Sequence, residues 1–381
     1  DHEVNDIVFT FTITNESAFD VGVTVNKNCI NDNRIFMDAP NNVETLAPQG
    51  QVTLTVKLQL QKVNGEYSNL DSAINATLLN FTKSQAPSYL ATNWTEQINA
   101  SNTSAFSSAK KISFVNVLDE SIKSDTNYKQ IKVGAEDELG NQTDLTNNTS
   151  VTDVIAYYNS TSKEIIICSP AIIYAPENCA SMFSSCRDLT SLDLSNFNTS
   201  KVTEMFSMFD GCSALTSLDV SNFDTSNVTN MRGMFAGCSG LTSLDLSNFN
   251  TSEVTDMNMM FSGCNGLTSL DLSNFNTSKV RDMSYMFETC MTLTSLDLSN
   301  FNTSKVTDMS SMFSDCMELV TIYVNSSKWS TVNVTRYDNM FRYCTKLVGG
   351  AGTIYNSSKT DKTYARVDGG TANPGYLTAK A

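Results

Sequence analysis

The middle of the chain repeats one pattern of apolar and polar positions every 26 residues. A typical unit begins at Leu241, and the same order of residue types starts again at Leu267. Two rows of residues mark the period most clearly: Phe183, Phe209, Phe235, Phe261, Phe287 and Phe313, and Cys186, Cys212, Cys238, Cys264, Cys290 and Cys316. Because one unit of this size cannot bury its apolar face alone, we expect neighbouring units to stack and share one core.

Each unit combines two apolar periods. Residues 241–247 alternate apolar and polar side chains, which is the pattern of a short strand with one buried face. The apolar residues that follow are spaced three, four and three apart, as on the buried stripe of a short helix. They are Val254, Met257, Phe261 and Cys264. Thr251 and Ser252 stand where a helix N-cap is expected. The pattern therefore predicts a solenoid of strand-plus-short-helix units.

Both ends of the array depart from the pattern. The step from Cys316 to Cys344 is 28 residues, and Lys163–Cys179 reads as a degenerate first unit. We therefore expect the solenoid, with its degenerate ends, to occupy residues 151–347. The Gly-rich segment after it predicts a C-terminal cap of short strands and turns over residues 348–381.

Residues 1–150 contain no repeat. Three stretches, 6–14, 19–25 and 51–60, alternate with period two and are rich in β-branched residues. They predict an antiparallel β-sandwich, followed by a polar linker over residues 135–150. Together with the repeats, this gives an expected fold class of α+β.

Net charge and apolar runs narrow the choice of partners. The chain has 25 Lys and Arg against 40 Asp and Glu, a formal net charge of −15. This balance argues against nucleic-acid binding and against docking on anionic lipid. Apolar runs such as Ile165–Cys168 are far shorter than the roughly 18 residues of a bilayer-spanning helix, so no membrane span is expected.

Catalysis is not expected. The one histidine is His2, which removes the usual general base and the commonest nitrogen ligand for metals. Catalysis by a pair of carboxylates needs no histidine, but such a pair needs a cleft that a stacked array does not suggest.

One row of acidic side chains is the candidate binding site. Asp193, Asp219, Asp245, Asp271 and Asp297 share one outward strand position, which Tyr323 occupies in the last full unit. In parallel, in-register strands they would lie about 4.8 Å apart. Repulsion at that distance, on the order of 1 kcal/mol in water, would raise some of their pKa values or attract cations. The functional interpretation is an acidic stripe that binds Ca²⁺ or partners bearing Lys and Arg. The alternative is a solvated face screened by salt and neighbouring hydroxyls. No cofactor is expected apart from this Ca²⁺ option.

The cysteine row supplies one thiol per unit at the end of the inward stripe, which does not make a tetrahedral metal cage. We expect packed free thiols that act as small apolar side chains. The alternative is occasional pairing, with Cys168 and Cys179 as the candidate disulfide.

Residues 293–316, LTSLDLSNFNTSKVTDMSSMFSDC, closely resemble the repeats of the BspA-like leucine-rich-repeat surface proteins of bacteria. The resemblance covers roughly residues 163–347, and residues 364–376 are similar to the segment that closes the array in that family. It implies secretion, an extracellular or cell-surface location, and adhesion to host or neighbouring-cell surface proteins. The expected function is therefore that of a bacterial adhesin.

Residues 9–15 and 46–56 resemble, more weakly, the β-sandwich of the TasA/camelysin-type biofilm fibre proteins. This resemblance implies self-association. The alternative function is a structural subunit of an extracellular fibre, assembled by strand addition of the N-terminal domain.

Overall fold

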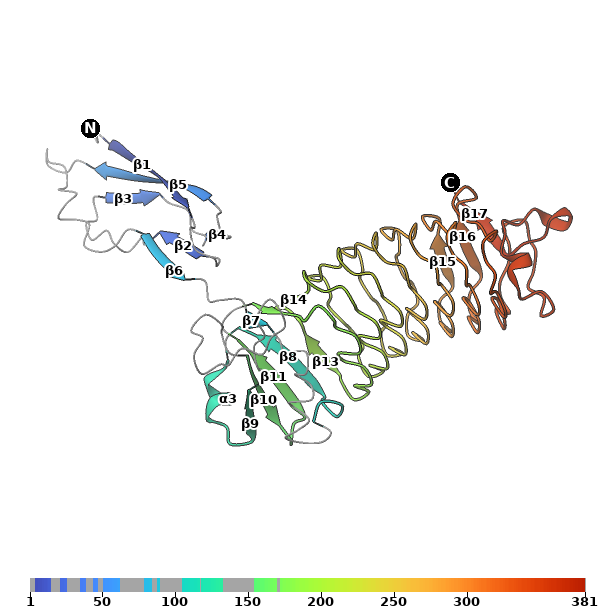
Figure 1. Cartoon of the computed structure of the whole chain (residues 1–381), viewed down its shortest axis with the longest axis horizontal. Helices are drawn as coiled ribbons and strands as arrows, with labels where there is room; N and C mark the ends of the chain where they lie inside the picture. The colour runs from blue at the N-terminus through green and yellow to red at the C-terminus, as the bar shows by residue number, and fades with distance from the viewer. Residues whose placement is uncertain are drawn as a thin grey trace. The chain divides into compact units, whose positions relative to one another are not determined.

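The computed structural model describes the strands between residues 4 and 89, and residues 105–116, 118–132, 154–169 and 172–380 more fully. The chain divides into two compact units, Asp1–Ala86 and Pro87–Ala381 (Figure 1). Each unit has its own strands and is described by itself.

The described strands of the first unit form two three-stranded antiparallel sheets. One has the order β1-β5-β3 and the other the order β4-β2-β6. The strands are β1 (Val4–Thr14), β2 (Val21–Val25), β3 (Ile35–Asp38), β4 (Glu44–Leu46), β5 (Gln51–Gln61) and β6 (Leu79–Lys83). β1 pairs with β5 along its whole length, from Val4 opposite Gln61 to Thr14 opposite Gln51. The three period-two stretches of the sequence thus coincide with β1, β2 and β5.

The second unit begins with a five-stranded sheet of order β13-β8-β11-β10-β9. Its strands are β8 (Lys111–Val115), β9 (Tyr128–Lys132), β10 (Ile155–Asn159), β11 (Glu164–Cys168) and β13 (Ser191–Asp193). A smaller parallel sheet joins β7 (Ser88–Tyr89), β12 (Ile173–Tyr174) and β14 (Phe197–Asn198). β8 lies parallel between β11 and β13. Composition placed the domain boundary near residue 150, whereas this pairing joins residues 111–115 to the first repeat.

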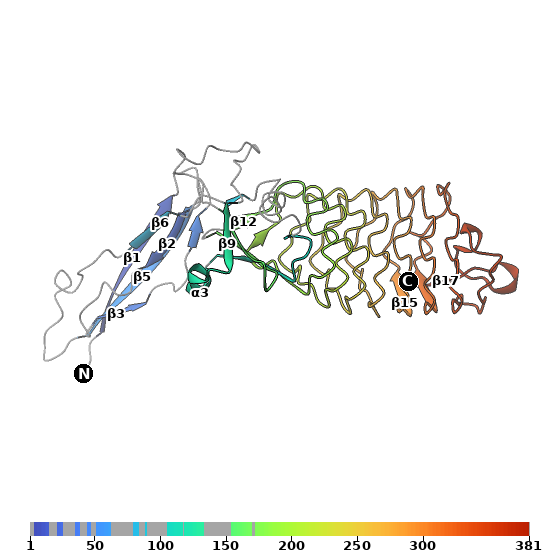
Figure 2. The same ribbon diagram turned by 90° about the horizontal axis from the view of Figure 1, so that it is seen from below.

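Consecutive repeats are stacked in parallel, as Figures 1 and 2 show for the coils that lead toward the C-terminus. Bridges join the same position of successive units: Asn178, Glu204, Asn230, Asp256, Asp282, Asp308 and Arg336. Near the end, β15 (Ser295–Leu298), β16 (Thr321–Val324) and β17 (Leu377–Ala379) form a parallel sheet in that order. Each coil is therefore bonded through its backbone to the next.

The predicted class, α+β with a solenoid of strand-plus-short-helix units, is wrong. Among the fully described residues there is one α-helix of five residues, α3 (Glu120–Ser124), and two 3-10 turns, η2 (Lys362–Tyr364) and η3 (Gly370–Ala372). The rest is short strands, small sheets and turns. The described part of the chain is thus nearly all β.

Bonds between units explain why the stripe at 254–264 is not helical. The amides of Met257, Met259 and Phe261 donate to carbonyls of the next unit, at 3.0, 2.9 and 3.0 Å. An α-helix needs these amides for bonds four residues back. Met259 and Gly263 have φ values of 59° and 72°, which end any helical turn. The three-four-three spacing therefore comes from successive tight turns.

The core is a row of stacked phenyl rings and thiols. Phe235 and Phe261 have ring centroids 5.9 Å apart and planes within 5° of parallel, and the neighbouring pairs repeat this geometry. The six buried thiols from Cys212 to Cys344 each donate to a Phe carbonyl of the preceding unit, as Cys264 does to Phe235 at 3.1 Å. Cys179 and the seven row cysteines from Cys186 to Cys344 form no disulfide, so Cys179 is not bonded to Cys168. The prediction of packed thiols is confirmed, and the suggested disulfide is wrong.

Residues after 348 cover the last coil. Tyr376 packs edge-on against Phe341, with ring centroids 5.2 Å apart, so it ends the aromatic row. The buried Asp368 accepts hydrogen bonds from the amides of Ala351, Thr353 and Gly370, each at 2.9 Å. It thereby ties two loops of this segment together.

Candidate functional site

The acidic row lies on the face formed by the first part of each unit. In the unit around residue 245, Leu244 and Leu246 are buried, so the side chain between them points outward. The same alternation exposes Asp193, Asp219, Asp245 and Asp271 and leaves Asp297 and Tyr323 half-buried. Asp297 lies directly opposite Tyr323 in the β15–β16 pair. We call these six residues the strand-face row; the structure brings all of them to one face, as expected.

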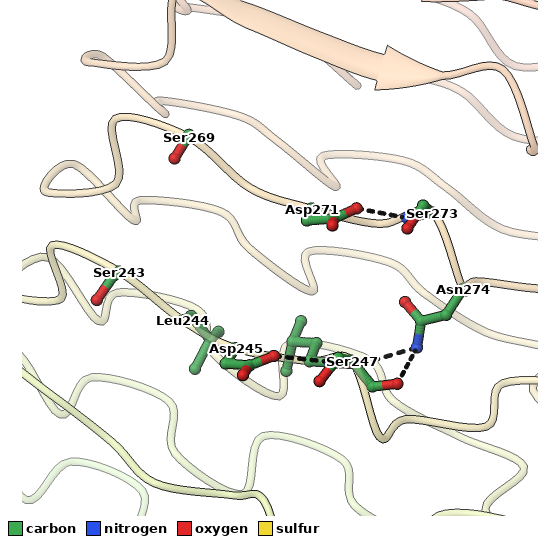
Figure 3. A pocket seen from close by; sticks show the side chains of 9 residues that line it. Ser243, Leu244, Asp245, Ser247, Ser269, Asp271, Ser273 and Asn274 are labelled. Carbon is green, nitrogen blue, oxygen red and sulfur yellow. Dashed lines mark hydrogen bonds between the residues drawn. The ribbon is translucent and has the colours of Figure 1, made fainter.

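Local hydrogen bonds hold each carboxylate of the row. Oδ1 of Asp245 accepts from the amide of Ser247 at 2.9 Å, and Asp271 accepts from Ser273 at 2.9 Å (Figure 3). The other three aspartates make the same bond to the serine two residues on, at 2.9 to 3.0 Å. Short polar side chains commonly bond their own backbone in this way. The row is thus a set of carboxylates in one fixed conformation.

The hydrogen bonds set the charge of the row. The backbone and side chain of Ser247 lower the pKa of Asp245, and repulsion from Asp219 opposes this without reversing it. The pKa values of Asp219 and Asp271 are lowered by their own serines. The expectation that repulsion raises some of the pKa values in the row is therefore wrong for Asp219, Asp245 and Asp271, because these exposed groups repel each other weakly through water. These carboxylates are ionised at neutral pH.

A shallow groove of about 480 Å³ lies between two neighbouring units of this face. Asp245 and Asp271 line it together with four serines, two leucines and Asn274 (Figure 3). The side-chain amide of Asn274 donates to the backbone carbonyls of Leu246 and Phe249 at 2.8 Å, which fixes one side of the groove. The groove offers a ligand two carboxylates and several hydroxyls on a rigid frame.

Lys380 occupies the C-terminal end of the row. Its Nζ forms an ion pair with Asp297, and it lies 5.6 Å from the centroid of the Tyr323 ring. Burial acts to raise the pKa of Asp297, but hydrogen bonds from Lys380 and Ser299 outweigh it and lower that pKa. Across residues 105–380, as far as the structure describes them, Lys380 is the one cation paired with the row.

The row presents its carboxylates singly, one to a coil. In the described part of the chain, no three His, Cys, Asp or Glu side chains converge as metal ligands would. None of the described helices is long and apolar enough to cross a membrane. A cation would therefore meet one carboxylate per unit on an open surface.

A second acidic row lies on the turn side of the coils. Asp256, Asp282 and Asp308 follow one another through backbone bridges. Burial is the main cause that raises the pKa of Asp256, while Asp308 pairs with Arg336 at 3.1 Å. The 26-residue period would have found this row in the sequence. The pairing of Lys380 with Asp297 has no such signal, because 83 positions separate the two residues.

Comparison with known proteins identifies a family for the repeats. Two overlapping stretches, residues 177–290 and 263–371, match the family described as Mycoplasma protein of unknown function, DUF285. No curated protein and no solved structure matches the chain. The matched stretches together span residues 177–371, just over half of the chain, and contain most of the stacked coils. The chain therefore belongs to the DUF285 family and is a bacterial repeat protein.

Proposed function

We propose that the protein is a non-catalytic adhesin of the bacterial cell surface, which binds basic patches on host or neighbouring-cell proteins through the strand-face row. The observation that carries this proposal is the state of Asp219, Asp245 and Asp271. They are exposed, ionised and held in place, and none of them has a cationic partner among the described residues.

A repeated row suits a protein partner with several cationic side chains. Each exposed ion pair contributes only about 0.2–1 kcal/mol, so a single lysine would bind weakly. Several such contacts add up when one partner carries them all. The carboxylates are already fixed by their serines, which reduces the conformational entropy lost on binding. Binding of this kind weakens as salt concentration rises.

The proposed location outside the cell rests on the resemblance of residues 293–316 to the BspA-like surface proteins. The free thiols of the repeats are compatible with it. Burial raises the pKa of the Cys238 thiol to about 12, so the reactive thiolate is scarce. The row of cysteines would therefore persist as thiols in an oxidising medium.

Adhesion can be tested with beads that carry the intact chain. Beads bearing the triple variant Asp219→Asn, Asp245→Asn, Asp271→Asn should bind epithelial cells at least tenfold less than beads bearing the unchanged chain. Protease treatment of the cells should abolish binding, because the proposed partner is a protein. Raising the salt from 50 to 500 mM should weaken it.

The matched control removes three exposed carboxylates outside the row, through Glu177→Gln, Asp188→Asn and Glu253→Gln. It changes the net charge by the same amount and should alter bead binding less than twofold. Equal losses in the two triple variants would contradict a specific role of the row.

The second candidate function is a fibre subunit that assembles by strand addition. The sheet order β1-β5-β3 places the 11-residue β1 at an edge, with β5 as its one partner among the described strands. Unpaired edges accept strands of other chains. This candidate predicts filaments in electron micrographs and light scattering that grows with concentration. A synthetic peptide copying residues 4–14 should block that growth, and a scrambled peptide should not.

A further inference from the structure

Strand β17 brings Lys380 onto the same face as the strand-face row. Thr378 lies opposite Tyr323 and Ala379 lies opposite Val324 in the parallel pair of β16 and β17. The amide of Lys380 continues this pairing, donating to the carbonyl of Val324 at 2.8 Å. Side chains alternate along a strand. Lys380 therefore projects on the side of Thr378, where its chain can run back over Tyr323.

The contacts of Lys380 are those that a lysine of another protein could make. Its ammonium pairs with Oδ2 of Asp297 and lies within cation–π range of the Tyr323 ring. Oδ1 of Asp297 is occupied by the amide of Ser299 at 3.0 Å. One free carboxylate oxygen and one ring face suit a compact ammonium better than the planar fork of arginine, which binds both oxygens of a carboxylate.

We propose that Lys380 is a resident ligand of the strand-face row: it fills the lysine position formed by Asp297 and Tyr323 and keeps partner lysines out of that end. The inference rests on the proposed function. It adds that the cation recognised is the lysine ammonium, and that the row is partly blocked by the protein itself. Partner lysines then use Asp219, Asp245 and Asp271, of which Asp245 and Asp271 line the groove.

The contact of Lys380 with Asp297 and Tyr323 is weak enough for another cation to displace Lys380. About half of each partner's side-chain surface remains exposed, 51% for Lys380 and 42% for Asp297. Ion pairs this exposed contribute little to stability. Removing the lysine side chain should therefore strengthen binding of a lysine-rich ligand two- to fivefold at low salt.

The test measures binding of fluorescein-labelled octalysine to the intact protein by fluorescence anisotropy. The variants are Lys380→Ala and the matched control Lys346→Ala. Lys346 forms an ion pair with Glu318 that is similarly exposed, 53% and 47%. Both variants remove one positive charge, so any general effect of net charge appears equally in both. We expect Lys380→Ala to bind octalysine two- to fivefold more tightly than Lys346→Ala.

Equal affinities of the two variants overturn the inference, and so does an absence of octalysine binding in both. An NMR titration of the Asp297 carboxyl gives a second readout that needs no ligand. The pKa of Asp297 should rise in Lys380→Ala and stay unchanged in Lys346→Ala. An unchanged pKa in both variants would show that Lys380 does not bind Asp297 in solution. The bead assay reports separately on adhesion, so adhesion can fail while lysine recognition holds, or the reverse.

Discussion

At the scale of single residues, hydrogen bonds to the carboxylates shift their pKa values more than repulsion between the carboxylates does. At Asp368 such hydrogen bonds also outweigh burial. Burial acts to raise its pKa, but hydrogen bonds from Thr353, Gly370 and Ala351 lower it to about 2. The carboxylate is thus needed in its charged form to join the two loops that it ties together.

This geometry predicts acid sensitivity with a defined sign. The pKa of Asp368 is lower in the folded protein than in the unfolded chain, where it is about 3.9. Its stabilisation is therefore complete above about pH 4 and is lost as the pH falls toward 2. We expect Asp368→Asn to lose about 2 kcal/mol at pH 7 in urea unfolding monitored by circular dichroism.

Comparison across pH supplies the control. The difference in stability between the unchanged protein and Asp368→Asn should shrink as the pH is lowered from 4 to 2. A difference that stays constant over this range would show that the charge of Asp368 does not matter.

At the scale of elements, buried hydroxyls join the coils. Thr251 was expected to lie at a helix N-cap, and this expectation is wrong. Its buried side chain reaches the next unit instead: Oγ1 accepts from the amide of Asn276 at 2.8 Å and donates to its carbonyl at 3.1 Å. Thr199, Thr225 and Thr277 repeat the arrangement.

Replacing this hydroxyl with a methyl group should be costly. Thr251→Val keeps the shape of the side chain but leaves two backbone groups of Asn276 without their partner. We expect a loss of about 1–3 kcal/mol in the free energy of unfolding, measured in urea. Thr255→Val is the control, since Thr255 is exposed and its hydroxyl makes only one longer bond between units, 3.3 Å to the carbonyl of Thr229; it should change stability by less than about 0.5 kcal/mol. Equal losses at both positions would contradict the joining role.

Periodicity in the sequence predicted correctly which side chains of a unit are buried. Leu244, Val254, Met257 and Cys264 all face the core, as their spacing indicated. It could not tell helix from turn, because the apolar spacing is the same and the difference lies in where the amides donate. Met257 donates to the next coil, and a pattern within one unit cannot show that.

The candidate site was predictable in part for the same reason. The outward position of Asp245 follows from alternation with Leu244 and Leu246. The lowered pKa follows from the bond to Ser247, which depends on local backbone geometry. The contact between Lys380 and Asp297 depends on how β17 joins β16, and the tail carries no periodic signal for that pairing.

At the scale of the whole molecule, identical coils should be interchangeable. Deleting residues 241–266 removes one full period, so that Phe235 would stack on Phe287 and Thr225 would meet Asn276. We expect this variant to fold and to unfold cooperatively. Its free energy of unfolding should fall less steeply with urea concentration, because less surface is buried.

A deletion of residues 241–253 removes half a period and serves as the control. It places polar turn residues opposite core positions and should abolish cooperative unfolding. If both deletions behave alike, stacking in register is not what holds the coils together.

The parallel bridges that join one coil to the next also define how the protein responds to mechanical load. A coil bonded mainly to its two neighbours can be peeled from the end of the stack while the others stay folded. Each peeled coil frees 26 residues, or roughly 90 Å of extended chain. Under tension, the molecule would lengthen in equal steps. The mechanical work would then be dissipated in many small unfolding events, one coil at a time.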